Sequence, residues 1–489
     1  MRALYLTAWL GFTALTGACT VGPDFTPPAS PPPAAGYASD GGSRAALGEG
    51  PDQRWWTALG SAQLDALVDR ALAANHSLEA SRATLASARE RIAAVVGRRL
   101  PQVDANARAE YEQVNLSAFG LSGNSPFGAI GNPKFDLYTL GGVVSYDLDL
   151  FGRNRRALER EVATAEARQR ETEAAHLTIA GRVVAQILAI AAFNDRIATE
   201  GELLAEGERT VTLTTKRQRA GVGTLVEVLS AQGQLANDRA VLPALEQQLA
   251  EGRAMLAVLL GISPAELGPT PFRLDDFTLP RQVPVALPSE LVHRRPDILQ
   301  AEARLHAAGA AVGVATAALY PDVTLGASLT QSSSIPGRIL SGSFTGYDVF
   351  AGLAAPIFHG GTLSAEKRGA EANARAADAT YRQVVTDAFG QVSSLLSALG
   401  NDARALTIQR DAADVAGRSL HLSRRSFEVG NSGILQVLEA NRTWQRARLA
   451  LLDARALQFQ NVARLYVATA GGWMLPERGV EAAPLATVR

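Results

Sequence analysis

The sequence of 489 residues has only one cysteine, Cys19, and no recognisable catalytic motif. A single cysteine excludes an internal disulfide framework and any metal site built from several cysteines. The six histidines are scattered without the spacing of metal ligands. No Gly-x-Ser-x-Gly sequence, phosphate-binding loop or pair of acids stands out. We therefore expect neither an enzyme nor a metal or other bound cofactor.

The sequence also has almost no net charge, because 47 basic residues are balanced by 48 acidic ones. This balance argues against a nucleic-acid partner. Aromatic residues make up only 6% of the chain, whereas alanine, the best helix former, is abundant. Beyond the N-terminus we find no run of ~20 predominantly apolar residues, since rich stretches such as 179–193 contain residues like Arg182 and Gln186. A membrane crossing would therefore need the strands of a closed β-barrel.

The N-terminus has the layout of a secretory signal peptide, with Arg2 before a mostly apolar run at 3–15 and small residues before Cys19. It resembles a lipobox, the signal for attaching a diacylglyceryl group to the cysteine, although Leu15 stands four residues before Cys19 rather than the usual three. We expect a signal peptide at 1–18 and a covalent lipid on Cys19. The alternative is an ordinary signal peptide with an incidental cysteine.

The residues after Cys19 indicate to which membrane a lipidated chain is sorted. Thr20 takes the place of the aspartate that retains lipoproteins at the inner membrane, so the lipobox resemblance implies the outer membrane. Residues 19–54 are rich in Pro, Gly, Ala and Ser, which is typical of an extended segment. We expect this segment to be a lipidated tether between the membrane and the body of the protein.

The rest of the chain contains one unit of roughly 210 residues twice. Matching segments recur in the same order, at separations of about 207 to 220 residues. The duplication predicts a first repeat at 55–270, a second at 271–474 and a C-terminal tail at 475–489. The matched segments are Leu100–Val103 with Tyr320–Val323, Asp149–Arg153 with Pro356–Gly360, Gly221–Leu225 with Gly430–Ile434, and Val228–Ala231 with Val437–Ala440.

Both repeats predict the same order of elements, namely a helix, two strands, a very long helix free of proline, a tight glycine turn and a second helix. Pro243 is expected to kink the second helix of the first repeat. The segments 118–137 and 334–346 are expected to be outer loops. The predicted elements are 61–98, 101–117, 138–150, 155–219 and 224–260 in the first repeat, and 289–318, 321–333, 345–357, 362–428 and 434–470 in the second.

The predicted strands alternate between apolar and polar residues. In 322–330, for example, Val323 and Leu325 point to one face and Asp322 and Thr324 to the other. Such alternation is typical of a transmembrane barrel, but the strands alone favour a half-buried strand in a soluble sheet. Four strands per chain cannot close a conducting barrel, so a pore would require several copies. Three chains would supply twelve strands.

The predicted helices carry a sharper signal. Apolar residues recur at steps of three and four along 224–260 and 434–470, which predicts a coiled-coil-like seam. At 1.5 Å per residue a long helix spans roughly 98 Å and each second helix roughly 55 Å. We therefore expect four antiparallel helical strands per chain, two of them continuous and two composed of shorter helices placed end to end.

Several segments together resemble the outer-membrane efflux lipoproteins of the TolC/OprM type, which include the NodT-type outer-membrane factors of RND efflux systems. The strongest match is Arg294–Ile298 followed by Ala301, Glu302 and Leu305. The order and spacing of the matches, from about 15 to 474, make the resemblance specific. The further matches are Val21–Phe25, Trp55-Trp56, Leu64-Asp65, Leu67-Val68, Asp149–Arg153, Pro356–Phe358, Leu438–Ala440 and Gly471–Trp473.

The resemblance implies a mixed α and β fold. Its expected form is a homotrimer with a twelve-stranded transmembrane β-barrel, four strands per chain, and a long periplasmic α-helical barrel with an equatorial collar. The implied function is that of the outer-membrane channel in a tripartite efflux pump, a passive duct for drugs or other small molecules. The implied partners are a periplasmic adaptor protein, an inner-membrane RND-type transporter and outer-membrane lipid. The resemblance also implies that the transporter, rather than the duct, selects the substrate.

The resemblance also assigns the two glycine turns at the far ends of the long helices. Glycine permits the positive φ that ends a helix, and in the family these turns are the periplasmic tips where the adaptor docks. We expect both roles. The turn residues are Ala220, Gly221, Val222, Gly223, Thr224, Val429, Gly430, Asn431, Ser432 and Gly433.

A gate is expected just beyond the second turn. Leu435, Glu439 and Arg442 share one helix face and match family positions that close the duct, although the acid there is usually Asp. Three copies of Glu439 and Arg442 are expected to pair between chains, while Leu435 seals the pore. The alternative is an exposed pair within one helix, worth a few tenths of a kcal/mol. The first repeat has no charge at the equivalent positions, Val226, Ser230 and Gly233.

Two alternatives to the efflux duct stay open. One is a duct for type I protein secretion, which the expected lipid anchor disfavours. The other, from a different class, is a lipid-tethered coiled-coil scaffold without a pore. Heat-resistant trimers in outer-membrane fractions would separate a duct from a scaffold, because a scaffold has no barrel.

Overall fold

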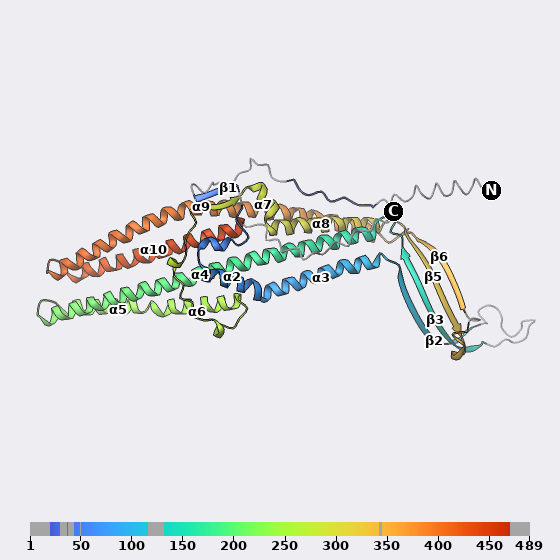
Figure 1. Ribbon diagram of the computed structural model, residues 1–489, viewed down its shortest axis with the longest axis horizontal. Coiled ribbons are helices and arrows are strands. Elements are labelled where there is room, and N and C mark those ends of the chain that lie inside the picture. The colour runs from blue at the N-terminus through green and yellow to red at the C-terminus, as the bar shows by residue number, and fades with distance from the viewer. Residues whose placement is uncertain are drawn as a thin grey trace, which may run out of the picture. The chain divides into compact units, whose positions relative to one another are not determined.

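The computed structural model describes residues 20–29, 37, 44–48, 50–115, 132–341 and 345–469. The expected signal peptide, Cys19 and the tail at 475–489 lie outside the described residues, as does most of the loop expected at 118–137. The elements follow one another in the predicted order (Figure 1). They are β1 (Ala45–Gly48), α2 (Ala62–Ala74), α3 (His76–Arg98), β2 (Gln102–Gln113), β3 (Lys134–Asp147), α4 (Arg153–Arg219), α5 (Leu225–Arg239), α6 (Leu242–Leu259), β4 (Val283–Ala286), α7 (Pro288–Arg294), α8 (Pro296–Ala317), β5 (Asp322–Ser333), β6 (Thr345–Ala354), α9 (Thr362–Glu428) and α10 (Ile434–Thr469), with short 3-10 helices at Trp55–Leu59, Pro264–Glu266, Leu274–Asp276 and Pro336–Arg338.

The chain forms two compact units, each made of segments that are distant in sequence. Unit 1 comprises Met1–Pro27, Ala86–Glu166 and Ala303–Ala379, and unit 2 comprises Pro28–Leu85, Ala167–Glu302 and Thr380–Arg489. Each unit therefore takes residues from both sequence repeats. The repeats expected at 55–270 and 271–474 and the compact units divide the chain in different ways.

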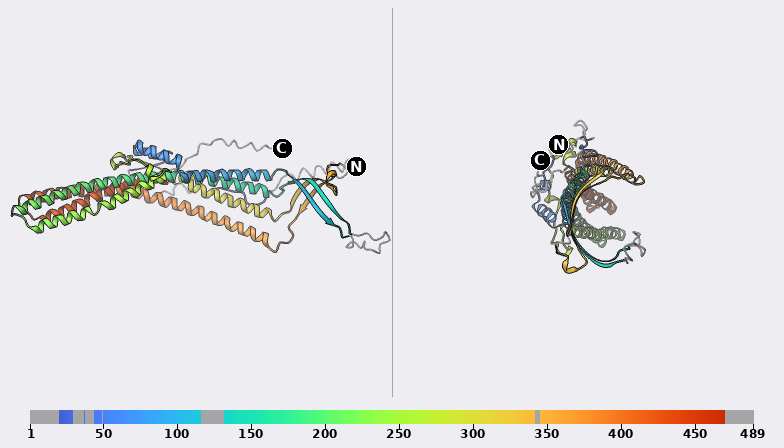
Figure 2. Two further views of the ribbon diagram at one scale, coloured as in Figure 1. Left: turned by 90° about the horizontal axis from the view of Figure 1, so that it is seen from below. Right: turned by 90° about the vertical axis from the view of Figure 1, so that its right-hand side faces the viewer.

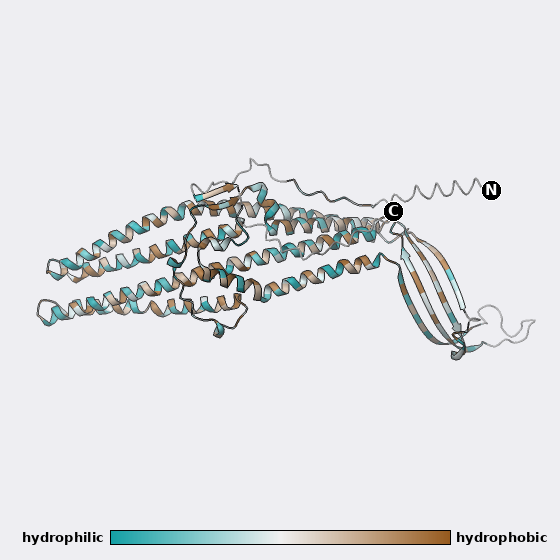
Figure 3. Cartoon of the chain, in the orientation of Figure 1, coloured by the Kyte–Doolittle hydropathy of each residue, from teal (hydrophilic) through white to brown (hydrophobic). Residues whose placement is uncertain are grey.

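Unit 1 contains an antiparallel sheet in the order β2-β3-β5-β6, which curves as one layer (Figure 2). Its register places apolar residues next to one another across all four strands: Val103 pairs with Val144, Val144 with Ala327, and Ala327 with Val349. Hydropathy alternates along the strands (Figure 3). The predicted alternation is therefore confirmed, and it divides the sheet into an apolar and a more polar face.

The apolar face of this sheet is exposed in a single chain. The side chains of Val349 and Leu353 are 79% and 71% exposed, and that of Val103 is 74% exposed. Within the described residues, β2 and β6 each pair along one edge only. Exposed apolar strands with open edges are prone to pair with another chain.

The two long helices have the expected length. α4 and α9 each contain 67 residues, which corresponds to about 100 Å of helix. α9 runs beside α10, to which it is joined by a short turn (Figure 1). The predicted kink at Pro243 is also confirmed, because the helix breaks at Ala240–Val241 and Pro243 lies in the first turn of α6, where a missing N–H costs nothing.

Two helices that the sequence predicts as continuous are interrupted. The helix expected at 61–98 breaks at Asn75, whose side-chain oxygen accepts hydrogen bonds from the N–H of Ser77 (2.9 Å) and Leu78 (3.3 Å) and so caps α3. The helix expected at 289–318 breaks at Arg295, which adopts an extended conformation before Pro296. A residue before proline is disfavoured in helical conformation.

The main hydrophobic core lies in unit 2. Trp55 and Trp56 are almost completely buried there, together with Ile187 and Leu188 of α4 and Phe459 of α10. Among the described helices, only α4 contains an 18-residue window long and apolar enough to cross a membrane, and half of that window is buried. Residues of α4 such as Ile187 and Leu188 belong to the hydrophobic core of unit 2.

A small parallel sheet joins the segment expected to be a tether to the second repeat. β1 pairs with β4 in unit 2, with Ala45 opposite Val283 and Gly48 opposite Ala286. Neither of these four-residue strands was predicted from the sequence. The last part of the expected tether at 19–54 is therefore attached to the folded body.

Candidate functional site

The first glycine turn closes the end of α4 in unit 2. Gly221 has a φ of +77°, a region in which a side chain would meet a steric penalty. The N–H of Val222 donates to the carbonyl oxygen of Arg217 (3.0 Å), a bond typical of a Schellman motif. Thr224 then caps α5 in a capping box with Glu227. The segment expected at Ala220–Thr224 is therefore a stop and restart between two helices.

The second glycine turn repeats this geometry after α9. Gly430 has a φ of +82°, and the N–H of Asn431 donates to the carbonyl oxygen of Ser426 (2.8 Å). α10 begins at Ile434, directly after the segment expected at Val429–Gly433. The matching bonds indicate that the sequence duplication is also a structural one at these tips.

A small hydrophobic cluster holds the two turns together. Phe427 at the end of α9 is 1% exposed, and Leu213 of α4 packs against the cluster. The guanidinium of Arg217 lies 4.6 Å from the ring centroid of Phe427 and donates to its carbonyl oxygen (3.1 Å). This contact is a cation–π interaction that links one turn to the other. The buried members of the cluster are Leu420, Phe427, Ile434, Val437 and Leu438.

The expected gate residues lie on α10 near these turns. The side chain of Leu435 is 71% exposed. The carboxylate of Glu439 lies 3.9 Å from Arg442 and 3.5 Å from Arg446, and all three side chains are largely exposed. The Nε of Arg442 donates to Oε1 of Gln234 on α5 (2.7 Å). Within one chain, Arg442 thus links α10 to α5, a contact that the sequence did not indicate.

An acidic cluster continues from this link toward the middle of unit 2. The carboxylate of Asp238 accepts hydrogen bonds from Gln234 (2.7 Å) and from Gln445 (3.2 Å). Glu200 on α4 is 5% exposed. Burial raises the pKa of its carboxyl, and the charge of Asp238 raises it further. The hydrogen bonds of Asp238 thus join α5 to α10, next to the buried carboxyl of Glu200 on α4.

Ion pairs join α4 to α9 and α10 in unit 2. Arg424 on α9 lies 2.6 Å from Glu206 on α4. A single exposed ion pair contributes little to stability. Here the pairs act together with the hydrophobic cluster around Phe427 and with the hydrogen bond from Arg442 to Gln234. The other pairs are Arg448 with Glu202 and Arg196 with Asp453.

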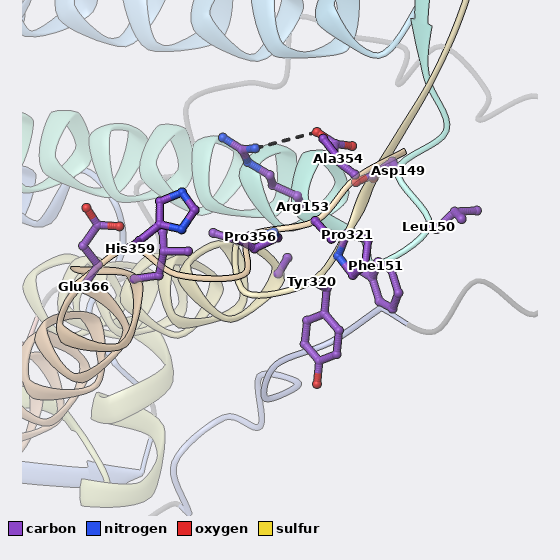
Figure 4. Close-up of a pocket in the computed structure, with 15 residues that line it drawn as sticks. Asp149, Leu150, Phe151, Arg153, Tyr320, Pro321, Ala354, Pro356, His359 and Glu366 are labelled. Carbon is purple, nitrogen blue, oxygen red and sulfur yellow. Dashed lines mark ion pairs between the residues drawn. The ribbon is translucent and has the colours of Figure 1, made fainter. Parts of the chain in front are cut away.

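A cavity of about 390 Å³ lies in unit 1, where strands give way to helices (Figure 4). The rings of Phe151 and Tyr320 stack there at 4.7 Å. Asp149 accepts hydrogen bonds from the backbone N–H of Asn154 (2.8 Å) and Arg155 (3.0 Å), so this carboxylate caps α4. Among the described residues, no group of three or more His, Cys, Asp and Glu is placed to hold a metal ion. We therefore assign these polar residues to the strand-to-helix junction.

The chain matches the family described as outer membrane efflux protein over residues 67–262 and 287–471. It is 31% identical over 430 residues to the pyoverdine export outer membrane protein OpmQ of Pseudomonas aeruginosa, covering 88% of this chain and 89% of that protein. It is 28% identical to the toluene efflux pump outer membrane protein TtgC of Pseudomonas putida, with 94% of both chains covered.

Solved structures give the same result. The outer-membrane channel OprN superposes with a TM-score of 0.85 at 28% identity, over 93% of this chain and all of that one. The outer membrane protein VceC of Vibrio cholerae superposes with a TM-score of 0.78 at 25% identity, over 87% of this chain and all of that one. The predicted mixed fold and efflux role are confirmed. The chain belongs to the outer membrane efflux protein family.

Proposed function

We propose that three copies of this efflux protein form one passive duct, in which four strands from each copy close a twelve-stranded barrel. The sheet of unit 1 is the observation that supports this most directly, because it has an exposed apolar face and two open edges. Its strands contain 10 to 14 residues, enough for the ~9–11 that cross a bilayer. Open edges are not tolerated in lipid, and a closed ring removes them.

In this proposal the turns of unit 2 are the periplasmic tips that contact an adaptor protein. The exposed apolar side chains of Val222 (64%) and Val429 (65%) support a contact surface there. Leu435, Glu439 and Arg442 form the gate. The bond from Arg442 to Gln234 holds α10 against α5 within each copy, so an outward movement of α10 has to break it.

The proposed cargo is a small molecule delivered by an inner-membrane transporter of the RND type through the adaptor. Two relatives are named for pyoverdine export and for toluene efflux, both small molecules. The proposed anchor is a covalent lipid on Cys19 in the outer membrane, with the helices projecting into the periplasm. The duct itself binds no cofactor and catalyses no reaction.

Conductance across a planar lipid bilayer tests the gate. The double variant Glu439→Ala/Arg442→Ala removes both charges and the link to Gln234, so we expect a larger conductance and more frequent opening than in the unmodified protein. The matched control is Ser230→Ala/Gly233→Ala, which changes the equivalent positions of the first repeat. This control should conduct like the unmodified protein.

Three results would contradict parts of the proposal. Unchanged closure in the Glu439→Ala/Arg442→Ala variant would remove the gate from these residues. Equal opening in both double variants would show that any change at the tips loosens them. A complete absence of conductance from purified, membrane-inserted protein would favour the scaffold without a pore.

A further inference from the structure

A groove lies between α4 and α10 in unit 2. Its volume is about 410 Å³, which is within the range of pockets that hold small molecules. Much of its wall is apolar, and Leu457 remains 45% exposed there. The groove therefore combines an apolar surface with a few polar groups. Its lining residues include Ala192, Phe193 and Arg196 of α4 and Asp453, Leu457 and Gln460 of α10.

One ion pair forms most of the polar part of the groove. The Nε and Nη2 atoms of Arg196 both donate to the same carboxylate oxygen of Asp453, Oδ1. The two side chains are 32% and 49% exposed, so solvent reaches both. The Nη1 of Arg196 and the Oδ2 of Asp453 take no part in these bonds. The pair therefore offers one donor and one acceptor to another molecule, while its own charges cancel.

The groove and the linker between α6 and β4 contact opposite faces of the two helices. Asn194 on α4 and Arg455 on α10 donate to backbone carbonyl oxygens of this linker, at 2.9 and 3.2 Å. Each donor stands two residues from a groove residue, Asn194 from Arg196 and Arg455 from Asp453. Two residues correspond to about 200° around a helix. The linker therefore covers one face of the helix pair, and the groove lies on the other.

The groove lies on the same face of α10 as the proposed gate. Leu435 and Asp453 are separated by about 18 residues, which is five helical turns. Glu439 and Leu457 have the same separation. Residues separated by whole turns point in the same direction. The face that the proposed gate turns toward the duct therefore continues to the groove, about 27 Å farther along α10.

We propose that this groove is a contact site for cargo in the wall of the duct, and that it takes small uncharged molecules with an apolar ring and an amide or hydroxyl group. The ring packs on Phe193 and Leu457. The polar group accepts a hydrogen bond from Arg196 and donates one to Asp453. A net charge on the molecule gains little, because the attraction of one partner is offset by the repulsion of the other. The inference rests on the proposed duct, which brings cargo past this face.

Protection of an introduced cysteine from alkylation tests the site. The Leu457→Cys variant of the full chain, purified from outer membranes, is treated with N-ethylmaleimide in the presence and absence of benzamide, which has the expected ring and amide. At a benzamide concentration about three times its dissociation constant, the introduced cysteine should react roughly fourfold more slowly. The matched control is Val258→Cys on α6, where the side chain is 62% exposed and the rate should not change. Unmodified protein shows whether Cys19 reacts by itself.

Charged relatives of benzamide test the role of the ion pair. Benzoate and benzylammonium have the same ring with a negative or a positive charge, and both should protect less than benzamide. Arg196→Gln leaves the carboxylate of Asp453 without its partner, so benzylammonium should then protect at least as well as benzamide. The matched control is Arg448→Gln, which removes the arginine of another exposed pair between α4 and α10, with Glu202. This control should leave the order of the three probes unchanged.

Each outcome bears on the proposal in one direction. Protection of Leu457→Cys but not of Val258→Cys by benzamide supports it. No protection, or equal protection at both positions, overturns it, and so does an introduced cysteine at 457 that reacts only after unfolding, because the groove is then covered. Protection by benzoate as strong as by benzamide overturns the preference for uncharged molecules. Native mass measurement of the same sample separates the levels: trimers without protection overturn the groove alone, whereas monomers overturn the proposed ring and with it the contact to cargo.

Discussion

Arg217 is the residue that joins the two turns most directly. Its guanidinium stacks on Phe427 and donates to the carbonyl oxygen of the same residue. In the Arg217→Gln variant the cation–π contact and the charge are lost, which costs about 1–2 kcal/mol. Hydrogen exchange of the turn amides should then be faster by roughly 5- to 30-fold.

The neighbouring arginine provides a control for this prediction. Arg219 ends the same helix and is exposed, so Arg219→Gln removes the same charge from the same terminus without a stacked ring. Its turn amides should exchange at the unmodified rate. If both variants accelerate exchange equally, the effect comes from lost charge at the helix end rather than from the contact with Phe427.

Glu200 makes stability depend on pH. Burial, and then the charge of Asp238, raises its pKa above the usual value of 4.5. The folded protein therefore holds this proton more tightly than the unfolded chain does. Its stabilising effect is complete below about pH 4.5 and is lost as the pH rises through the folded-state pKa. Glutamine cannot ionise, so the Glu200→Gln variant does not lose stability as the pH rises. This variant should therefore have a higher thermal midpoint than the unmodified protein at pH 7.

The pH series distinguishes this effect from a general one. The advantage of Glu200→Gln should shrink as the pH falls through 4.5 and disappear below it, where the unmodified carboxyl also carries its proton in both states. Glu246 is exposed on α6, so Glu246→Gln should leave the midpoint nearly unchanged at every pH. An advantage of Glu200→Gln that is independent of pH would contradict the role of burial.

At the scale of single residues, the sequence predicts which side chains share a helix face better than it predicts which side chains they contact on other helices. The spacing of Leu435, Glu439 and Arg442 correctly predicts one helix face, and the exposed Glu439–Arg442 pair within that helix is the alternative arrangement that the sequence left open. It cannot indicate Gln234, because that residue is about 200 positions away and meets Arg442 only through the packing of α5 against α10. Whether the charges also pair between copies stays a prediction.

At the scale of elements, the sheet of unit 1 makes a prediction about its two faces. Val349 lies in the apolar row and is 79% exposed. If this face meets the middle of a bilayer, an arginine there destabilises the folded protein by about 2–4 kcal/mol. On a surface that faces water, the same substitution changes the stability by at most about 0.5 kcal/mol. We expect Val349→Arg to abolish assembly into the outer membrane, measured as the yield of membrane-inserted trimer.

The adjacent residue is the matched control. Asp348 is on the same strand but points to the opposite face, where it contacts Ser328. Asp348→Arg introduces the same side chain at nearly the same depth, and if this face lines a water-filled lumen, the trimer yield should stay close to that of unmodified protein. Equal yields from both variants would mean that the apolar face does not meet lipid.

Elements were predictable where a period or a strong terminator specifies them. The 67-residue helices follow from long stretches without proline, and the turns follow from glycines that adopt positive φ. The breaks at Asn75 and Arg295 were missed because periodicity continues across them, although Pro296 is a signal that could have located the second break. β1 and β4 were missed because four residues are too few to show alternation.

At the scale of the whole molecule, the sequence duplication predicts the architecture of the chain but not the differences between its two repeats. It predicts the order of elements and the two similar turns, and the folded chain contains both. It does not predict that one repeat covers its apolar stripe with the same chain and the other leaves it exposed. That difference appears only when Leu438 and Leu229 are compared in the folded chain.

The last prediction concerns what holds the protein in the membrane. Each buried methylene of a lipid adds about 0.8 kcal/mol, so a single acyl chain binds membranes marginally, whereas the two chains of a diacylglyceryl group can hold a protein at a membrane. Strands that close a barrel remain inserted without any lipid. When residues 1–19 are replaced by a signal peptide without a lipobox cysteine, we therefore expect the processed protein to stay in the outer-membrane fraction, with slower assembly as the main change.

The same replacement combined with Val349→Arg separates the two modes of attachment. If the sheet crosses the membrane, the single change at the N-terminus leaves the protein in the membrane fraction, and only the combination releases it to the periplasm. If the lipid is the sole anchor, loss of Cys19 alone releases the protein, and Val349→Arg adds nothing. The second result would favour the tethered scaffold, because a chain held only by its lipid cannot form the wall of a duct.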